Sequence, residues 1–186
     1  MSHLFERLQM KKSKYALIAL LTALAASAAS AQSMSNQGYY GEVGYTAFTI
    51  KNENNGFDIT PKLARLIVGK EINQGLAVEG TYAFTVSDDT SVFNGKSYTG
   101  KASMYGAYLK PKFQVTQDVE AFARVGAIKV DYEDQVVNFS RTKLSYGIGA
   151  QVQFTKNVYG QVDYMNYGEE NGISAKGVTI SVGTRF

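Results

Sequence analysis

Apolar side chains alternate with polar or very small ones in eight successive segments between Gln37 and Phe186. In the clearest segment, from Lys143 to Thr155, every second residue from Leu144 to Phe154 is apolar, and the residues between are Ser, Gly or Gln. A period of two residues indicates β-strands, because successive side chains point to opposite faces of a strand. Eight such segments separated by turns are typical of a barrel with an apolar outer face. We therefore predict an all-β protein, an eight-stranded antiparallel up-and-down transmembrane β-barrel.

The connectors between the expected strands alternate in length. The strands are expected at 38–51, 59–72, 75–87, 101–115, 119–131, 141–155, 158–167 and 177–186. Three connectors are tight turns, at 73–74, 116–118 and 156–157, whereas those at 52–58, 88–100, 132–140 and 168–176 are longer and polar. Outer-membrane barrels show this asymmetry, with the short turns on the periplasmic side. An even number of strands also lets the first and last strands pair, which leaves no sheet edge open in lipid.

The alternation alone does not say which face is outside, because a soluble barrel can enclose its apolar face around a ligand. Here the non-apolar face is rich in Gly, Ser, Thr and Gln, which fit the narrow interior of eight strands. The aromatic residues of the apolar face gather near the strand ends, as in the aromatic girdles of membrane barrels. The girdle at the short-turn end comprises Tyr39, Phe113, Phe154 and Phe186, and the girdle at the long-loop end comprises Tyr45, Phe84, Tyr105, Tyr146 and Tyr164. From Tyr146 to Phe154 the chain spans about 21 Å of membrane normal, close to the expected apolar band of about 25 Å.

The other face carries charges of both signs, which we predict to form one lumen network. Its members are Glu42, Arg65, Glu71, Glu79, Lys110, Lys112, Glu120, Arg124, Lys143, Asp163 and Arg185. Charges in so narrow a lumen must be paired or hydrated. Mixed signs favour a structural network that fixes the strand register. The alternative is a narrow gated pore in which a pair such as Glu79 and Arg124 changes partner.

The N-terminal segment has the three parts of a secretory signal peptide. Lys11, Lys12 and Lys14 form a basic region, 15–26 is an apolar stretch, and 29–31 is a small-residue cleavage site. We expect a cleaved signal peptide at 1–31 and a barrel domain at 32–186, with Met10 as an alternative start. Removing 1–31 leaves 15 basic and 15 acidic residues, so no electrostatic case for nucleic-acid binding remains. Without cysteine there is no disulfide framework.

Several segments carry a family resemblance. They are GYYGEVGYTAF (38–48), ARLIVGKEINQGLAVEGTYAF (64–84), AFARVGA (121–127), LSYGIGAQVQF (144–154) and the final SVGTRF. Together they resemble the small outer-membrane proteins of the OmpA/OmpX-like β-barrel superfamily, over essentially all of the expected mature chain. The resemblance implies an outer-membrane barrel of a Gram-negative bacterium, inserted by the barrel assembly machinery through a C-terminal signal ending in Phe186. It does not imply cell-wall anchoring, because the periplasmic peptidoglycan-binding domain of many OmpA proteins has no counterpart in this sequence.

The sequence offers little for catalysis. The outer-membrane enzymes of similar size, which include the lipid A palmitoyltransferase and deacylase, the phospholipase and the omptin proteases, resemble one another in using histidine. The only histidine here is His3, in the expected leader, and there is no cysteine. The usual proton acceptor at neutral pH and the thiol nucleophile are therefore missing. We predict no enzymatic activity, no cofactor and no metal site. The acidic pairs at 88–89, 133–134 and 169–170 are a weak signal for Ca²⁺ or Mg²⁺ at the loop rim.

The best hypothesis from sequence is a non-enzymatic integral outer-membrane protein with a polar, charge-paired lumen, acting in envelope structure or surface interaction. Its expected partners are outer-membrane lipid and lipopolysaccharide, the barrel assembly machinery during insertion, and a surface ligand that the sequence does not identify. Two alternatives stay open at this point. One is a narrow gated pore for small ions or solutes, and the other is a soluble periplasmic ligand-binding barrel.

Overall fold

The computed structural model describes residues 38–53, 57–87, 90–93, 96–99, 101–133, 138–170 and 172–186. The predicted signal peptide at 1–31 lies outside these ranges. Within them, the residues form eleven strands. No helix in these ranges is both long enough and apolar enough to cross a membrane.

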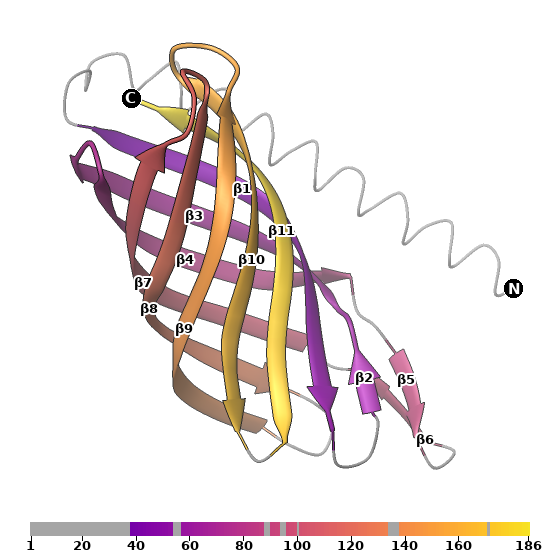
Figure 1. Ribbon diagram of the computed structural model, residues 1–186. Helices are drawn as coiled ribbons and strands as arrows, with labels where there is room; N and C mark the ends of the chain where they lie inside the picture. Colours follow the sequence, from indigo (N-terminus) through magenta and orange to yellow (C-terminus); the bar gives the residue numbers. More distant parts are fainter. Residues whose placement is uncertain are drawn as a thin grey trace, which may run out of the picture.

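Eight long strands close into a barrel (Figure 1). They are β1 (Tyr39–Asn52), β3 (Lys62–Asn73), β4 (Leu76–Ser87), β7 (Lys101–Gln114), β8 (Val119–Glu133), β9 (Asn138–Gln153), β10 (Val158–Glu170) and β11 (Ile173–Arg185). Each pairs antiparallel with the next, and β11 pairs with β1 from Tyr40 opposite Arg185 to Asn52 opposite Ile173. This last pairing closes the sheet, so the predicted eight-stranded antiparallel barrel is confirmed.

The short turns lie at the upper end of Figure 1, near the C-terminus, and the longer connections lie at the lower end. The first turn falls on Gln74 and Gly75, one residue later than predicted, because the Asn73 side chain accepts a hydrogen bond from the Gly75 amide at 2.8 Å. At the lower end, the expected loops at 132–140 and 168–176 are shorter than predicted. Strands β8 to β11 continue into them, since backbone pairing persists where the apolar alternation has already ended.

Three short strands occupy the other two expected loops. Strand β2 (Phe57–Ile59) pairs with β1 in the same register as β3, so β2 and β3 are one strand interrupted at Thr60 and Pro61. Proline has no backbone N–H to donate to the ladder, which accounts for the break. Strands β5 (Thr90–Phe93) and β6 (Lys96–Thr99) form a separate hairpin within the range expected to be a loop.

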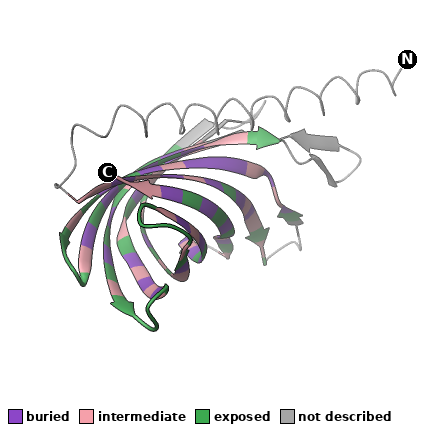
Figure 2. Ribbon diagram, turned by 90° about the horizontal axis from the view of Figure 1, so that it is seen from above, coloured by how far each residue is buried: buried purple, intermediate pink, exposed green. Residues whose placement is uncertain are grey.

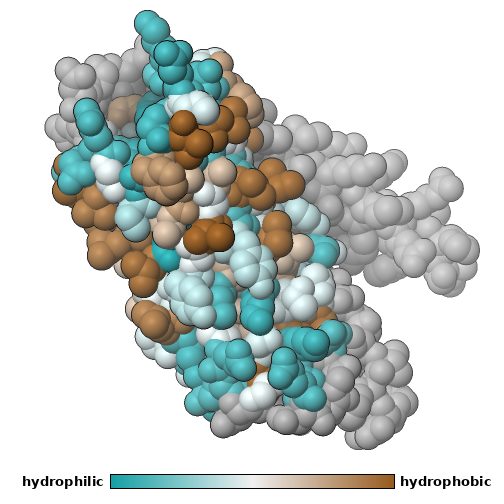
Figure 3. Space-filling model, in the orientation of Figure 1, coloured by the Kyte–Doolittle hydropathy of each residue, from teal (hydrophilic) through white to brown (hydrophobic). Residues whose placement is uncertain are grey.

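The two faces of the barrel wall differ sharply. Buried and exposed residues alternate along the strands (Figure 2), with Ile148 68% and Ile180 69% exposed while Arg124 is 1% exposed. On the face shown in Figure 3, hydrophobic side chains gather over the upper and middle parts of the strands, and hydrophilic ones cover the lower end. The apolar face therefore points away from the lumen, and the charged face fills it.

Inside the barrel, large side chains lie directly across the ladder from glycines. The pairs are Tyr40 with Gly69, Tyr108 with Gly126, Phe122 with Gly149, Tyr159 with Gly183 and Met165 with Gly147. A Cβ added at Gly149 would lie 2.4 Å from the Phe122 ring and 2.5 Å from the Val162 carbonyl oxygen. The lumen has room for these rings because the opposite position has no side chain.

We therefore expect Gly149→Ala to lower the free energy of unfolding by about 1–3 kcal/mol, the usual cost of overpacking. Gly80→Ala is the matched control, because Gly80 is exposed and a Cβ there meets nothing closer than 3.9 Å. Urea unfolding of the refolded barrel in lipid vesicles measures both variants. Equal stability of the two variants would contradict this steric account.

Candidate functional site

Arg124 lies at the centre of the lumen and binds carboxylates from three strands. It projects from β8, and its side chain is 1% exposed. Its Nε donates to Glu79 Oε2 at 2.5 Å, its Nη1 donates to Asp163 Oδ2 at 2.8 Å, and its Nη2 donates to Glu42 Oε2 at 3.2 Å. Glu42 is on β1, which lies four strands away from β8 in either direction around the barrel. The contact between Arg124 and Glu42 therefore crosses the full width of the lumen.

Two further cations complete this central network. Arg65 on β3 forms a two-pronged ion pair with Asp163, and its Nη2 also lies 3.4 Å from Ser181 Oγ on β11. Lys110 on β7 donates to Gln161 at 3.1 Å and to Gln151 on β9 at 3.4 Å. The Lys110 ammonium also lies 3.4 Å from both Glu42 and Glu79. The central network thus includes at least one side chain from each of the eight barrel strands.

The charges of the central network balance. Three cations, Arg65, Lys110 and Arg124, meet the three carboxylates of Glu42, Glu79 and Asp163. A lone buried charge is very costly, and pairing with good hydrogen bonds offsets that cost. The arrangement can hold the strands in register, and it presents no single-sign lining of the kind that selects ions in a pore.

Aromatic rings flank the central network. Tyr40 donates its hydroxyl hydrogen to Glu79 at 2.7 Å, and Tyr159 donates to Glu42 at 2.8 Å. The Phe122 ring contacts two cations, with Lys110 Nζ 4.4 Å and the Arg124 guanidinium carbon 4.7 Å from its centroid. These contacts satisfy the remaining carboxylate oxygens and place π faces against the buried cations.

Four of the predicted network residues form a second, separate cluster at the short-turn end. Lys112 bridges Glu71 at 2.6 Å and Glu120 at 3.3 Å, and Arg185 Nε lies 3.7 Å from Glu71. This cluster is also balanced, with two cations and two carboxylates. One oxygen of Glu120 is buried without a hydrogen-bond partner among the described residues.

Lys143 lies apart from both groups. Its strand parity is inward as expected, but it lies at the loop end, where Lys143 and Arg141 both donate to Glu170. The hydrogen bond from Lys143, and after it the one from Arg141, lowers the pKa of the Glu170 carboxyl below its ordinary value. The eleven predicted charges thus divide by depth into a central network, a short-turn cluster and a loop-rim group.

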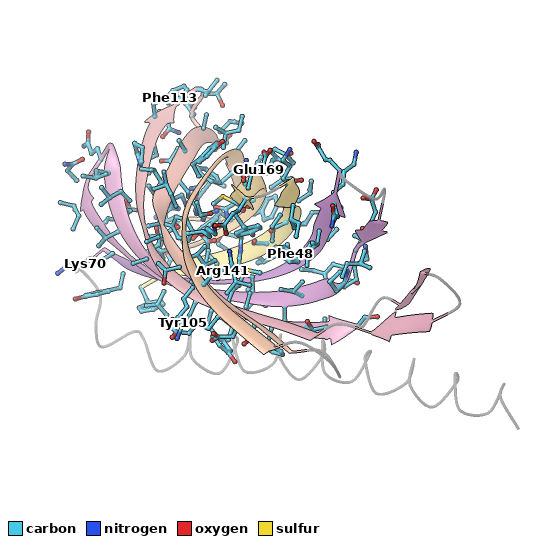
Figure 4. The ribbon with its side chains drawn as sticks, turned by 90° about the horizontal axis from the view of Figure 1, so that it is seen from below. Phe48, Lys70, Tyr105, Phe113, Arg141 and Glu169 are labelled. Carbon is cyan, nitrogen blue, oxygen red and sulfur yellow. The ribbon has the colours of Figure 1, made fainter. Side chains whose placement is uncertain are left out.

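Between the central network and the loop rim, the lumen contains an apolar layer that the sequence analysis did not predict. It consists of Phe48, Leu63, Ala83, Met104, Tyr108, Ile128, Met165 and Tyr167, all buried. Figure 4 shows Phe48 within the ring of strands, whereas Lys70, Tyr105 and Phe113 lie outside it. A cavity of about 10 Å³ lies where this layer meets Arg65 and Arg124, which is room for about one water molecule.

The predicted girdle residues lie on the outer face of the barrel or at its ends. Tyr45, Tyr105, Tyr146 and Tyr164 are about half exposed at the loop end, while Phe113 and Phe154 are each 65% exposed at the short-turn end. Tyr39, Phe84 and Phe186 are partly buried. Phe186 donates its backbone N–H to the Tyr39 carbonyl at 2.9 Å, which ties the last residue to the start of β1. The assignment of these rings to membrane interfaces, and of Phe186 to an assembly signal, stays a prediction.

Sequence reasoning missed the neutral members of the network. Tyr40, Tyr159, Gln151 and Gln161 bind the central charges, and each has the inward parity of its strand. That parity was the available signal, but it was applied only to charged residues. The ion pair between Arg141 and Glu170 was missed because Glu170 was expected in the loop at 168–176, beyond the end of its strand.

The acidic pairs are only partly described. Asp88, Asp89 and Asp134 lie outside the described residues, and Glu170 is held by Arg141 and Lys143. Among the described side chains, no three His, Cys, Asp or Glu residues are grouped so as to hold a metal ion. A divalent cation at the loop rim therefore stays a prediction.

A closed eight-stranded barrel with an apolar outer face and a charge-filled lumen defines the class of small outer-membrane β-barrels. The chain belongs to the family described as the outer membrane protein beta-barrel domain, whose model matches residues 16–186. It is 25% identical over 147 residues to the attachment invasion locus protein of Yersinia enterocolitica. The match covers 76% of this chain and 82% of that protein. This family consists of outer-membrane barrels of Gram-negative bacteria.

Solved structures show the same fold. Ail, the attachment invasion locus protein of Yersinia pestis, in complex with the heparin analogue sucrose octasulfate, has a TM-score of 0.59 at 21% identity, over 81% of this chain and all of that chain. Neisserial surface protein A has a TM-score of 0.61 at 17% identity, over 80% of this chain and 97% of that chain. OprG of Pseudomonas aeruginosa has a TM-score of 0.57 at 10% identity, over 81% of this chain and 96% of that chain.

If Arg124 holds the central network together, Arg124→Gln leaves the three carboxylates short of one positive charge. We expect a loss of about 3–5 kcal/mol in the free energy of unfolding, the usual cost of breaking a buried ion pair. The double variant Arg124→Gln with Glu79→Gln restores the balance and is expected to regain part of that loss. Urea unfolding followed by far-ultraviolet circular dichroism measures both.

The control for Arg124→Gln is Arg141→Gln at the loop rim. The Arg141 side chain is 53% exposed, so we expect nearly unchanged stability. If Arg124→Gln lowered the free energy of unfolding as little as Arg141→Gln, the central network would not hold the strands together.

Proposed function

We propose that this protein is a non-enzymatic integral protein of the outer membrane of a Gram-negative bacterium, acting in envelope structure or surface interaction. In this proposal, residues 1–31 are a cleaved signal peptide and the barrel assembly machinery inserts the chain. Outer-membrane lipid and lipopolysaccharide surround the barrel. The family membership supports the location.

One observation carries this proposal over the pore alternative: the lumen is crossed at its centre by a neutral network that includes all eight barrel strands. A second barrier, the apolar layer, lies between this network and the loop rim. A gated conduit would require ion pairs such as Arg124 with Glu79 to part, and two hydrogen bonds join these side chains. With the lumen filled, the outer wall and the loop end are the surfaces left for function.

The relatives support surface interaction as the role. The curated relative bears the name attachment invasion locus protein, and its Yersinia pestis counterpart was crystallised with a heparin analogue. A specific ligand does not follow for this chain, because loops vary freely on a shared scaffold. The soluble-barrel alternative is disfavoured by the apolar outer wall, since a row of residues such as Val68, Ile148 and Ile180 facing water would be unfavourable.

The chemistry of the available side chains supports the non-enzymatic part of the proposal. The expected mature chain has neither histidine nor cysteine. The buried carboxylates of Glu42, Glu79 and Asp163 are all engaged by cations inside the lumen. Their burial and ion pairs favour a structural role for these groups.

Single-channel recording in planar bilayers tests the proposal. The wild-type barrel is expected to give no stable openings whose conductance rises in proportion to salt concentration. Glu79→Gln is the matched variant, because it keeps the side-chain volume but removes one charge facing Arg124, and we expect it to stay closed as well. Large, stable, salt-proportional openings of the wild type would overturn the proposal in favour of a pore, and openings only in Glu79→Gln would assign gating to this pair.

A further inference from the structure

The barrel wall divides between two of its strands at the loop end. Among the described residues, the ladder between β9 and β10 ends at Asn166 opposite Tyr146. Both strands continue beyond this pair, but residues 138–145 of β9 pair with β8, and residues 168–170 of β10 pair with β11. In Figure 1 the lower part of β9 curves away from β10. We call the gap in the ladder the wall split, and the segments 138–145 and 168–170 its two lips.

A bulge in β10 directs this strand away from β9. The register between β10 and β11 shifts between Asn166 and Gly168, and Gly168 has a φ of 121°, which residues other than glycine rarely adopt. The Asn166 side chain holds the bend by accepting a hydrogen bond from the Gly168 amide at 2.8 Å. Bulges bend a strand and increase its local twist. The end of β10 therefore follows β11 and leaves β9.

Side chains bridge the wall split where the backbone pairs end. At its base, Ser145 donates its hydroxyl hydrogen to the Asn166 carbonyl at 2.8 Å. Further toward the loops, Arg141 and Lys143 from the β9 lip both donate to one carboxylate oxygen of Glu170 on the β10 lip. The Arg141 and Glu170 side chains are 53% and 41% exposed. Exposed ion pairs are weak, so this contact can favour closed lips and still be released.

The wall split lies beside the apolar layer of the lumen. Tyr167, the bulged residue at the end of the ladder, is 4% exposed, and its ring packs edge-to-face on Phe48 with centroids 5.3 Å apart. Met165 is 1% exposed and lines the small cavity together with Tyr167. Because Tyr167 directly precedes the β10 lip, a movement of this lip would draw the Tyr167 ring away from Phe48 and uncover Met165.

We propose that the two lips of the wall split move apart and together, with Glu170 as the latch that holds them closed. This inference goes beyond the proposed function, because it assigns a movement to the barrel wall. Opening brings the apolar layer into contact with its surroundings at the loop end. It does not open a conduit, because the central network lies deeper and joins side chains from all eight barrel strands.

Oxidation of the buried methionines tests the latch. The refolded barrel is treated with dilute hydrogen peroxide, and mass spectrometry follows sulfoxide formation, whose rate at a buried residue depends on the fraction of open molecules. We expect Glu170→Gln to raise the rate at Met165 about two- to fivefold, the range that loss of an exposed ion pair allows. Met104, on β7 and away from the wall split, is expected to keep its rate.

Asp131→Asn is the matched control for Glu170→Gln. It removes a partly exposed ion pair, 3.9 Å from Lys129, whose two members both lie on β8 and bridge no split. The Met165 rate of this variant is expected to equal that of the wild type.

A reversal of the charges supplies a rescue. Glu170→Lys alone places three cations together, so its Met165 rate is expected to exceed that of Glu170→Gln. Glu170→Lys combined with Arg141→Glu and Lys143→Glu restores attraction between the lips and is expected to return the rate to the wild-type value.

Three outcomes overturn the inference. They are an unchanged Met165 rate in Glu170→Gln, an equal rise at Met104 and Met165, and failure of the charge-reversed variant to recover. The second outcome would indicate general loosening of the barrel instead of separation of the lips. All substitutions lie at the loop end and leave the central network intact, and heat-modifiable gel migration verifies that each variant is folded.

Discussion

Neutralisation of charge inside a closed sheet is the constraint on which this structure depends. Eight strands enclose a lumen too narrow for bulk water, so a charged side chain pointing inward must find its partner on another strand. Arg124 does so by binding Glu42, Glu79 and Asp163, which come from three different strands. Each of these contacts is long-range in the chain and fixes the register of the strands that it joins. A slip of one residue would place the charges in lipid and the apolar residues in the lumen.

The same constraint shapes what the protein can do. The central network and the apolar layer on its loop side fill the lumen, and the large rings opposite glycines leave little free space between them. A barrel closed in this way is a rigid support. Its chemistry is then presented at two places, the loop end and the outer wall. Envelope structure and surface interaction are functions that such a support can perform without a conduit or a catalytic centre.

The period of two in the sequence was sufficient for the strands and for the separation of the two faces, because it depends only on the geometry of a single strand. Which face is outside followed from the small polar residues of one face and from the placing of the aromatic residues on the other. It also identified which charges point inward, from Glu42 on β1 to Arg185 on β11. It carried no information on depth or on partners, since these depend on how strands far apart in the chain are staggered. For that reason Lys143 was assigned to a network that it does not join. Phe48, Leu63 and Met104, which share the inward parity, were not recognised as an apolar layer. The strands also continue past the end of their apolar pattern, because backbone hydrogen bonds do not require it.

The absence of cysteine makes the most direct test of this inside-out arrangement straightforward. Single cysteines introduced at Ile148 and Ile180 on the outer wall, and at Thr179 in the lumen, can each carry a spin label in barrels reconstituted into lipid vesicles. Paramagnetic resonance then compares collisions with oxygen, which concentrates in hydrocarbon, against collisions with a water-soluble nickel chelate. Labels at Ile148 and Ile180 are expected to collide with oxygen and not with the chelate, and the label at Thr179 is expected to be shielded from both. Strong collisions with the chelate at Ile148 and Ile180 would show that this wall faces water and would contradict the account.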